Sequence, residues 1–276
     1  MAESVEGPAP LSTSDGPVAV VTGGGGGIGT AVCARLATRG YRLVVVDLDA
    51  EAAERVAETV GGSAFAADVS DPEPNRAMVT HALARYGRLD LVVLNAGISS
   101  GQPPGDPLDV ARYRRTVGVN VDGVVFGIDA AVPALPPGTA IVVVASLAAL
   151  GPEAANPVYA LAKSAVLGYV RALAVPLAER GIRINALCPG FTDTGILGVT
   201  GKLLRKQGFP LLTPDQVAAA LTTMLDAAGT GTAWTLVPGR PPAPFAFPAL
   251  PTPLRPDGGE ATLRPFLAPR PKETVL

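Results

Sequence analysis

The chain has few of the residues that build metal sites, disulfide frameworks or histidine-dependent active sites. Its 276 residues include one histidine, His81, and two cysteines, Cys33 and Cys188. A single histidine disfavours a histidine-based metal site and a Ser-His-Asp triad. Two cysteines provide no disulfide framework and suit a reducing compartment. We therefore expect no metal, and thiols that serve as small buried hydrophobic side chains.

Strong charge of either sign is also missing. The formal net charge is −2 and the isoelectric point is about 5.5, so nothing indicates a nucleic-acid partner or an anionic membrane surface. No uninterrupted apolar run reaches about 18 residues, which predicts no membrane-spanning helix. The first sixteen residues contain three acidic side chains and lack the order of a signal peptide. We expect a soluble, cytoplasmic protein.

What the chain does contain is an alternation of strand and helix patterns. Hydrophobic residues make up 48% of it, which is ample for one large core. Strands are predicted at residues 18–22, 42–46, 63–67, 89–94, 140–145, 183–187 and 233–237. Helices are predicted at 28–39, 51–60, 73–86, 110–132, from 157 onward, and at 214–228. This order predicts an α/β, doubly wound (Rossmann-like), parallel seven-stranded sheet with helices on both faces.

The two ends differ in composition from this domain. Residues 1–16 predict a flexible N-terminal arm, residues 17–239 the Rossmann-type domain, and residues 240–276 a proline-rich tail. Eleven of the 28 prolines fall in residues 238–276, so this end is expected to be extended or irregular. Two interpretations stay open for the tail: a disordered end, or a strap across a partner subunit or the active-site edge. The strap would use Phe245, Phe247, Leu250 and Leu254.

Residues 22–29 form a glycine-rich turn between the first strand and the first helix. Glycines allow a tight turn and close approach of a pyrophosphate, and the helix N-terminus supplies N–H donors. A flexible loop is the plainer interpretation, but the position between a strand and a helix disfavours it. Asp47, 18 residues after Gly29, ends the second strand, where its carboxylate can bind ribose hydroxyls and repel a 2′-phosphate. This favours NAD over NADP.

Ser146 and the pair Tyr159/Lys163 suggest alcohol or carbonyl chemistry. Ser146 follows the strand at 140–145, at the edge where such sheets bind ligands. Tyr159 and Lys163 are four residues apart and share one helix face. An ammonium beside the phenol is expected to lower the pKa of Tyr159 toward the range of a general base, while Ser146 holds a substrate oxygen. An ordinary surface pair remains the alternative for a lone motif.

Together these residues resemble the short-chain dehydrogenase/reductase family of the compact single-domain type, over about residues 17–237. Leu94, Ala145 and the segment 237–240 depart from the family's pattern. The matching pieces, in the family's order, are Thr22-Gly23-x-x-x-Gly27-Ile28-Gly29, Asp68-Val69, Asn95-Ala96-Gly97, Asn120, Ser146, Tyr159-x-x-x-Lys163 and Pro189-Gly190-Phe191-Thr192-Asp193-Thr194.

The resemblance implies a role for each piece. Tyr159 would be the acid/base, Ser146 would orient the substrate oxygen, Lys163 would hold the nicotinamide ribose, and Asn120 would anchor a relay water. The residues implied to bind NAD are Thr22, Gly23, Gly27, Ile28, Gly29, Asp47, Asp68, Val69, Asn95, Gly97, Tyr159, Lys163, Pro189, Gly190, Thr192 and Thr194. Asp68 and Val69 would contact the adenine, and Thr192 with Thr194 the carboxamide. The resemblance also implies a homodimer or homotetramer that pairs the helices containing Asn120 and Tyr159.

The sequence thus predicts an NAD(H)-dependent oxidoreductase that interconverts a secondary alcohol and a ketone. A mainly apolar pocket is expected to take a hydrophobic or alicyclic substrate, and the segment 195–210 could be a mobile lid over it. Two alternatives are a non-catalytic dinucleotide-binding sensor or scaffold, and an NADH-dependent ketoreductase. The candidate substrate contacts are Ser146, Leu147, Glu153, Phe191 and Ile196, with Ile98 and Val158 nearby.

Overall fold

The computed structural model of the protein describes residues 16–101, 105–249 and 251–259. The predicted N-terminal arm, apart from Gly16, therefore lies outside the described residues. So do Leu250 and residues 260–276 of the predicted tail.

The described residues form one sheet of eight strands in the order β3-β2-β1-β4-β5-β6-β7-β8. All neighbouring pairs are parallel except β7 and β8. The strand order reverses between β1 and β4, which creates the crevice where doubly wound sheets bind ligands. The strands are β1 Val18–Thr22, β2 Arg42–Asp47, β3 Ser63–Ala66, β4 Leu91–Leu94, β5 Ala140–Val144, β6 Arg183–Pro189, β7 Ala233–Leu236 and β8 Ala243–Pro244.

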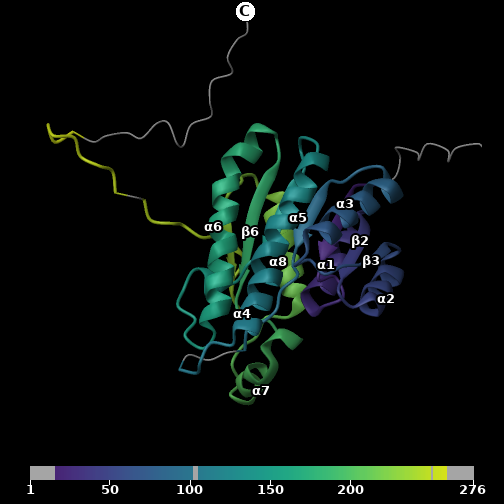
Figure 1. The fold of residues 1–276 in the computed structure, drawn as a ribbon, viewed down its shortest axis with the longest axis horizontal. Helices are drawn as coiled ribbons and strands as arrows, with labels where there is room; N and C mark the ends of the chain where they lie inside the picture. The colour runs from purple at the N-terminus through teal and green to yellow at the C-terminus, as the bar shows by residue number, and fades with distance from the viewer. Residues whose placement is uncertain (1–15, 102–104, 250, 260–276) are drawn as a thin grey trace, which may run out of the picture.

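Helices cover both faces of the sheet (Figure 1). One apolar cluster joins the sheet to α3, α5 and α6, and a second joins its other face to α1, α2 and α8. The helices are α1 Gly27–Thr38, α2 Ala50–Val60, α3 Pro72–Tyr86, α4 Val110–Val117, α5 Gly123–Ala131, α6 Pro157–Glu179, α7 Gly198–Lys206 and α8 Pro214–Asp226.

The strand β1 shows why the central strands are apolar without alternation. Val18 and Val20 belong to the cluster under α3, α5 and α6, and Ala19 and Val21 belong to the cluster under α1, α2 and α8. All four side chains are fully buried. A parallel strand covered on both faces needs apolar side chains at every position, and this confirms the predicted fold class.

The predicted helix at 110–132 is interrupted. The structure has α4, a π-helical turn over Gly118–Asp122, and then α5. A Cβ added to Gly123 would lie 2.8 Å from Cγ2 of Val69, so the helix passes unusually close to the loop after β3. Such turns are often found at functional sites, and this one contains Asn120.

A helix, α7, forms in the segment 195–210, which the sequence analysis treated as a mobile lid without a predicted helix; the lid stays a prediction. Gly198 and Gly201 lower the helix propensity of α7, which explains why it was missed. Two signals were present: Val199 and Leu203 are four residues apart, and Arg205 and Lys206 stand in the last turn, where cations favour a helix.

The eighth strand corrects the predicted count of seven. β8 pairs with β7 through Trp234↔Pro244 and Thr235↔Ala243, and the Phe245 N–H donates to the Ala233 carbonyl at 2.7 Å. Proline is tolerated here because β8 is an edge strand. Farther along, the Arg171 guanidinium on α6 lies 3.8 Å from the centre of the Phe247 ring. The tail is therefore docked through Phe247, and the residues after it extend away from the body (Figure 1).

Two helical stretches have the length and the mean hydropathy (1.4) of membrane-spanning segments, although no unbroken apolar run of that length occurs. They are Val110–Ala134 and Pro157–Glu179, with 39% and 33% of their most apolar windows buried. Both contribute buried side chains to the core beside the sheet, and core helices have this composition too. One or two such helices are weak evidence for a membrane protein, so the absence of a membrane span stays a prediction.

Candidate active site

The candidate site is built at the carboxyl edge of the sheet, where β1 and β4 part. The Thr22 hydroxyl oxygen at the end of β1 accepts hydrogen bonds from the backbone N–H groups of Asn95 (3.0 Å) and Ala96 (3.1 Å). The Asn95 amide donates back to the carbonyls of Thr22 (3.0 Å) and Gly23 (3.1 Å). These four bonds join two strand ends that are more than 70 residues apart in the chain, and they fix the shape of the crevice.

The glycine turn has the geometry that a pyrophosphate requires. Gly23 has a φ of +63°, and a Cβ on Gly29 would lie 2.0 Å from the Gly23 carbonyl oxygen, so α1 packs directly against the turn. Gly26 caps α1 without a side-chain bond, and no acidic residue occupies the first turn. The N–H groups of α1 are thus open to an anion, and the residues present fit a dinucleotide.

Asp47 lies beside this turn, as the sequence predicted. Its Oδ2 accepts from the Gly25 N–H at 2.9 Å, and its Oδ1 accepts from the Asp49 N–H at 3.1 Å. Each carboxylate oxygen has a second lone pair that can accept from a ribose hydroxyl. Leu48 is 72% exposed and brings no cation to the position.

The other residues expected to bind the cofactor lie on the same edge. Asp68 Oδ1 accepts from both the N–H (2.9 Å) and the hydroxyl (2.7 Å) of Ser70, and Val69 is buried. The Thr194 methyl group would lie 2.9 Å from a Cβ on Gly27, which places this threonine against the glycine turn.

Pro189, Gly190 and Thr192 continue from the end of β6. Thr192 is buried, and its hydroxyl donates to the Gly190 carbonyl at 3.1 Å. Thr192 therefore bonds to the backbone as a turn residue does. Thr194, which lies against Gly27, is the threonine that reaches the crevice.

Ser146 and Tyr159 meet as expected. Their hydroxyl groups are hydrogen-bonded, which favours the phenolate. The Ser146 oxygen also accepts from the Ala148 N–H at 3.2 Å, which leaves its own proton for the bond to Tyr159. Burial nevertheless dominates and raises the pKa of Tyr159 above its ordinary value, with the Glu153 carboxylate acting in the same direction.

Lys163 lies under Tyr159, with its ammonium nitrogen 5.7 Å from the centre of the tyrosine ring. This ammonium donates to the Val144 carbonyl at 2.9 Å, and burial lowers the pKa of Lys163 to about 8. The sequence predicted that Lys163 lowers the pKa of Tyr159. This prediction is wrong for this structure, because burial raises that pKa and the side chain that acts to lower it is Ser146. Lys163 instead ties α6 to the end of β5.

Asn120 holds the loop after β4. Its side-chain oxygen accepts from the Ile98 N–H, and its amide donates to the Ile98 carbonyl, both at 2.8 Å. A Cβ on Gly97 would lie 3.3 Å from both the Asn120 oxygen and the Lys163 nitrogen, so these two groups are neighbours. A water at this position could bridge them, and the relay role stays a prediction.

The sequence analysis missed a clamp between the loop after β4 and the start of α6. The Asn156 amide donates to the Ser99 hydroxyl at 2.7 Å, and the Ser100 hydroxyl donates to the Asn156 oxygen. Asn156 precedes α6, so the clamp positions the helix that carries Tyr159. No local pattern could have revealed it, since the partners are more than 50 residues apart.

Cys188 on β6 also belongs to the site's surroundings. It is fully buried, as predicted for a small hydrophobic side chain, and burial raises its pKa to about 11. The Ser146 backbone is hydrogen-bonded to its sulfur, and the Lys163 charge acts on it. Cys188 therefore supports the loop that presents the Ser146 hydroxyl.

The predicted substrate contacts have mixed environments. Leu147 packs against the core cluster on the α6 face, and Phe191 and Ile196 are 39% and 38% exposed. Phe191 meets Phe209 edge-on, with ring centres 5.8 Å apart, so the segment that contains α7 is joined to the end of β6. Glu153 is half-buried, and its charge reaches Tyr159.

Comparisons with known proteins agree with this geometry. The pattern of the short chain dehydrogenase family matches residues 17–202. The chain is 36% identical over 187 residues to the cyclohexanol dehydrogenase of Acinetobacter sp. (strain SE19), covering 65% of this chain and 74% of that one. It is also 36% identical over 217 residues to the cis-4-hydroxycyclohexanecarboxylate dehydrogenase of Sinomonas cyclohexanicum, covering 74% and 87%.

Solved structures share the fold over about four fifths of this chain. The NADH complex of a 3-ketoacyl-(acyl-carrier-protein) reductase from Brucella melitensis superimposes with a TM-score of 0.75 at 33% identity, covering 82% of this chain and 98% of that one. The NADP complex of a short chain dehydrogenase from Burkholderia cenocepacia J2315 gives 0.74 at 32% identity, covering 80% and 96%. Similar folds of this kind thus accept either dinucleotide.

The site and these comparisons lead to one conclusion. A glycine turn fitted to a dinucleotide lies on the same sheet edge as a serine–tyrosine pair with a lysine beneath it. The protein is an oxidoreductase that interconverts a secondary alcohol and a ketone with a nicotinamide dinucleotide, and the chain belongs to the short-chain dehydrogenase family.

Proposed function

We propose that the protein is an NAD(H)-dependent dehydrogenase of hydrophobic or alicyclic secondary alcohols. The observation that carries this proposal is the hydrogen-bonded pair of Ser146 and Tyr159, both half-buried, at the sheet edge. A nicotinamide bound there would accept or supply the hydride. Tyr159 would exchange the hydroxyl proton with the substrate oxygen, and the Ser146 hydroxyl would donate to that oxygen when the substrate is bound.

The choice of NAD rests on Asp47. A 2′-phosphate at the ribose would meet its carboxylate, and the neighbouring positions 48 and 49 offer no arginine or lysine to offset the repulsion. We expect Asp47→Ala to reduce the preference for NAD over NADP by about 100-fold, since two hydrogen bonds to a charged group are lost and a repulsion is removed. Unchanged preference in this variant would contradict the assignment.

The substrate class follows from the apolar side chains and from the relatives. Leu147 follows Ser146 directly, Phe191 and Ile196 offer partly exposed apolar surface after β6, and related enzymes are named for alicyclic alcohols. The raised pKa of Tyr159 means that alkaline conditions favour deprotonation of the substrate alcohol, so the oxidation should accelerate as the pH rises.

We also propose a homodimer or homotetramer located in the cytoplasm. In Val110–Ala134 and Pro157–Glu179, only 39% and 33% of the most apolar 18-residue segment is buried. Leu161 and Val175 on α6 are 52% and 42% exposed. A second copy packed against this face would remove that apolar surface from water. The free, buried cysteines suit a reducing compartment.

The test is NADH formation from NAD and a panel of alicyclic secondary alcohols at mildly alkaline pH, with NADP as a parallel cofactor. Tyr159→Phe is expected to lower kcat by about 100-fold or more while leaving NAD binding intact, because only the acid/base hydroxyl is lost. Turnover that survives this substitution would contradict the role of Tyr159. Binding of NAD with no turnover of any alcohol or ketone would favour a non-catalytic sensor.

A further inference from the structure

The connection between β7 and β8 presents an arginine on a rigid turn. The Arg240 N–H donates to the Val237 carbonyl at 3.2 Å, and Gly239 has a φ of +76° after Pro238. This is the geometry of a type II β-turn with proline and glycine at its two central positions. Pro241 and Pro242 follow immediately and restrict the backbone of Arg240 further. The turn is anchored on one side by β7 and on the other by β8.

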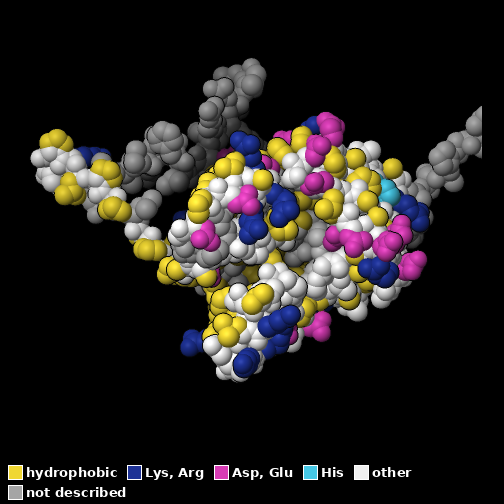
Figure 2. All heavy atoms as spheres, turned by 60° about the horizontal axis from the view of Figure 1, so that its bottom comes forward, with side chains coloured by type: hydrophobic (Ala, Val, Ile, Leu, Met, Phe, Trp, Pro, Cys, Tyr) yellow, Lys and Arg dark blue, Asp and Glu magenta, His cyan; other side chains and the backbone are white. Residues whose placement is uncertain are grey.

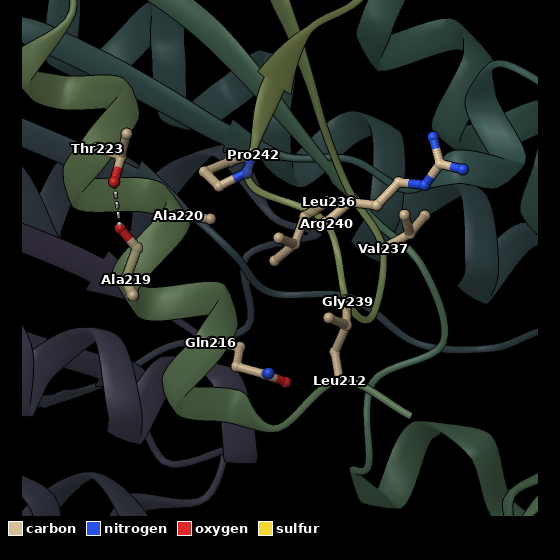
Figure 3. A pocket seen from close by; sticks show the side chains of 10 residues that line it. All are labelled: Leu212, Gln216, Ala219, Ala220, Thr223, Leu236, Val237, Gly239, Arg240 and Pro242. Carbon is tan, nitrogen blue, oxygen red and sulfur yellow. Dashed lines mark hydrogen bonds between the residues drawn. The ribbon is translucent and has the colours of Figure 1, made fainter. Parts of the chain in front are cut away.

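The two sides of this turn face different parts of the molecule. All four residues Leu236, Val237, Arg240 and Pro242 line one pocket beside α8. Within it, Leu236 and Pro242 point toward α8, whereas the end of the Arg240 side chain extends away from α8, on the side of Val237 (Figure 3). The neighbours of Val237 show which part of the molecule lies on its side of the turn. A Cβ added to Gly190 would lie 3.8 Å from Cγ1 of Val237 and 3.4 Å from Cδ1 of Leu147. Arg240 is therefore directed to the side of the turn where Leu147 leads to Ser146.

The guanidinium of Arg240 has no protein partner within residues 16–101, 105–249 and 251–259. No ion pair, ring contact or side-chain hydrogen bond is made by it there, and the residue is exposed. The turn restricts the backbone of Arg240, so little backbone freedom is lost on binding, and the guanidinium offers five N–H donors to an anion.

Further positive charge lies on α7, the helix beyond the end of β6. Lys202 and Lys206 are exposed, and no ion pair within the described parts of the chain involves either of them. Basic side chains are visible on the lobe that lies lowest in Figure 2, where Figure 1 places α7. These charges would raise the local concentration of an anionic substrate.

Negative charge is found at the reacting end. The Glu153 carboxylate acts on Tyr159 and raises its pKa. Leu147, Gly190 and Val237 separate Ser146 from the turn that contains Arg240. A substrate anion next to the carbinol would be repelled by Glu153, and an anion at the far end of the substrate would be attracted by Arg240.

We propose that Arg240 is a substrate-binding residue, and that the protein acts on alcohols with an anionic group, such as a carboxylate, remote from the carbinol carbon. This inference rests on the proposed function and narrows its substrate class. The charge on Arg240 binds the anion and thereby orients the substrate, with its carbinol toward Ser146 and Tyr159.

The test compares 2-, 3- and 4-hydroxycyclohexanecarboxylates, each beside its neutral methyl ester, in the NAD-linked assay. The 3- or 4-hydroxy acid is expected to exceed its ester in kcat/KM by about tenfold, and the 2-hydroxy acid is not. Arg240→Gln should remove that advantage while changing the ester by less than about twofold. Arg240→Lys should retain part of it, and Arg255→Gln, on the same tail, should behave as the wild type.

Inhibition gives a second readout that does not require the acid to react. Cyclohexanecarboxylate should compete with cyclohexanol, and Arg240→Gln should raise its inhibition constant by about tenfold. Turnover of neutral alcohols with no preference for any remote acid, or equal losses for acid and ester in Arg240→Gln, would overturn the inference and leave the proposed function standing. Failure of every alcohol, neutral or charged, would overturn both.

Discussion

The hydroxyl of Thr22 is the point where the crevice between β1 and β4 can be tested most directly. Thr22→Val replaces the hydroxyl by a methyl group of the same shape and leaves the backbone N–H groups of Asn95 and Ala96 without their acceptor. Thr22 itself is 2% exposed, so water cannot replace the lost oxygen at that side chain. The variant thus removes these two accepted hydrogen bonds, and the bond that the hydroxyl donates to the Val93 carbonyl at 3.5 Å, at a single buried atom.

The magnitude follows from those two donors. An unsatisfied buried donor costs about 1–3 kcal/mol, and these two are half-buried, so we take about 1–2 kcal/mol for each. Thr22→Val should therefore lose about 2–4 kcal/mol of unfolding free energy. Because the same bonds place Asn95 beside the glycine turn, NAD binding should weaken as well.

Urea unfolding followed by circular dichroism measures the first effect, and calorimetric titration with NAD measures the second. Thr22→Ser is the matched control, since it keeps the hydroxyl and loses only a methyl group. The midpoint should fall in Thr22→Val with an unchanged dependence on urea, which would show that stability and not compactness has changed. If the valine variant were as stable as the serine variant within about 0.5 kcal/mol, the reasoning about the two donors would be refuted.

Three further predictions concern Lys163, Gly29 and the tail. Burial lowers the pKa of Lys163 to about 8, so between pH 8 and 9 the folded state releases a proton that the unfolded chain retains. Over that interval the unfolding free energy of the wild type should rise by about 1 kcal/mol relative to Lys163→Met, and parallel curves would contradict the buried charge. Gly29→Ala would place a Cβ 2.0 Å from the Gly23 carbonyl oxygen, so it should lower the melting temperature and abolish NAD binding; a variant that binds NAD normally would show that the turn is not rigid. Arg171→Leu removes the cation from the Phe247 ring and should expose residues after β8 to limited proteolysis with turnover unchanged, whereas equal cleavage of both proteins would mean that this contact does not dock the tail.

Short-range patterns in the sequence were enough for the fold and for much of the site. The apolar runs of β1, β2 and β5 have no polar alternation because both faces are covered, so they predict a parallel sheet by themselves. The glycine turn and Asp47 depend on local backbone freedom and on the end of one strand. The spacing of Tyr159 and Lys163 follows from 3.6 residues per helical turn. Each of these features is encoded within a few residues.

Other features depend on partners that lie far apart in the chain. The bonds from Thr22 to the Asn95 loop, and from Asn156 to Ser99 and Ser100, join segments more than 50 residues apart, and no local pattern announces them. The eighth strand forms although β8 contains a proline. An edge strand needs no backbone N–H donor on the side that has no neighbouring strand.

The sequence by itself determined which groups are brought to the carboxyl edge, because a parallel sheet delivers every strand end and helix start to one side. The tertiary structure alone decided how those groups behave. Desolvation depends on everything packed around a side chain, so only the folded chain raises the pKa of Tyr159, commits Lys163 to the Val144 carbonyl and lowers its pKa. The same holds for Arg240, since the direction of its side chain is set by the turn between two strands and by the contact of Val237 beside Gly190.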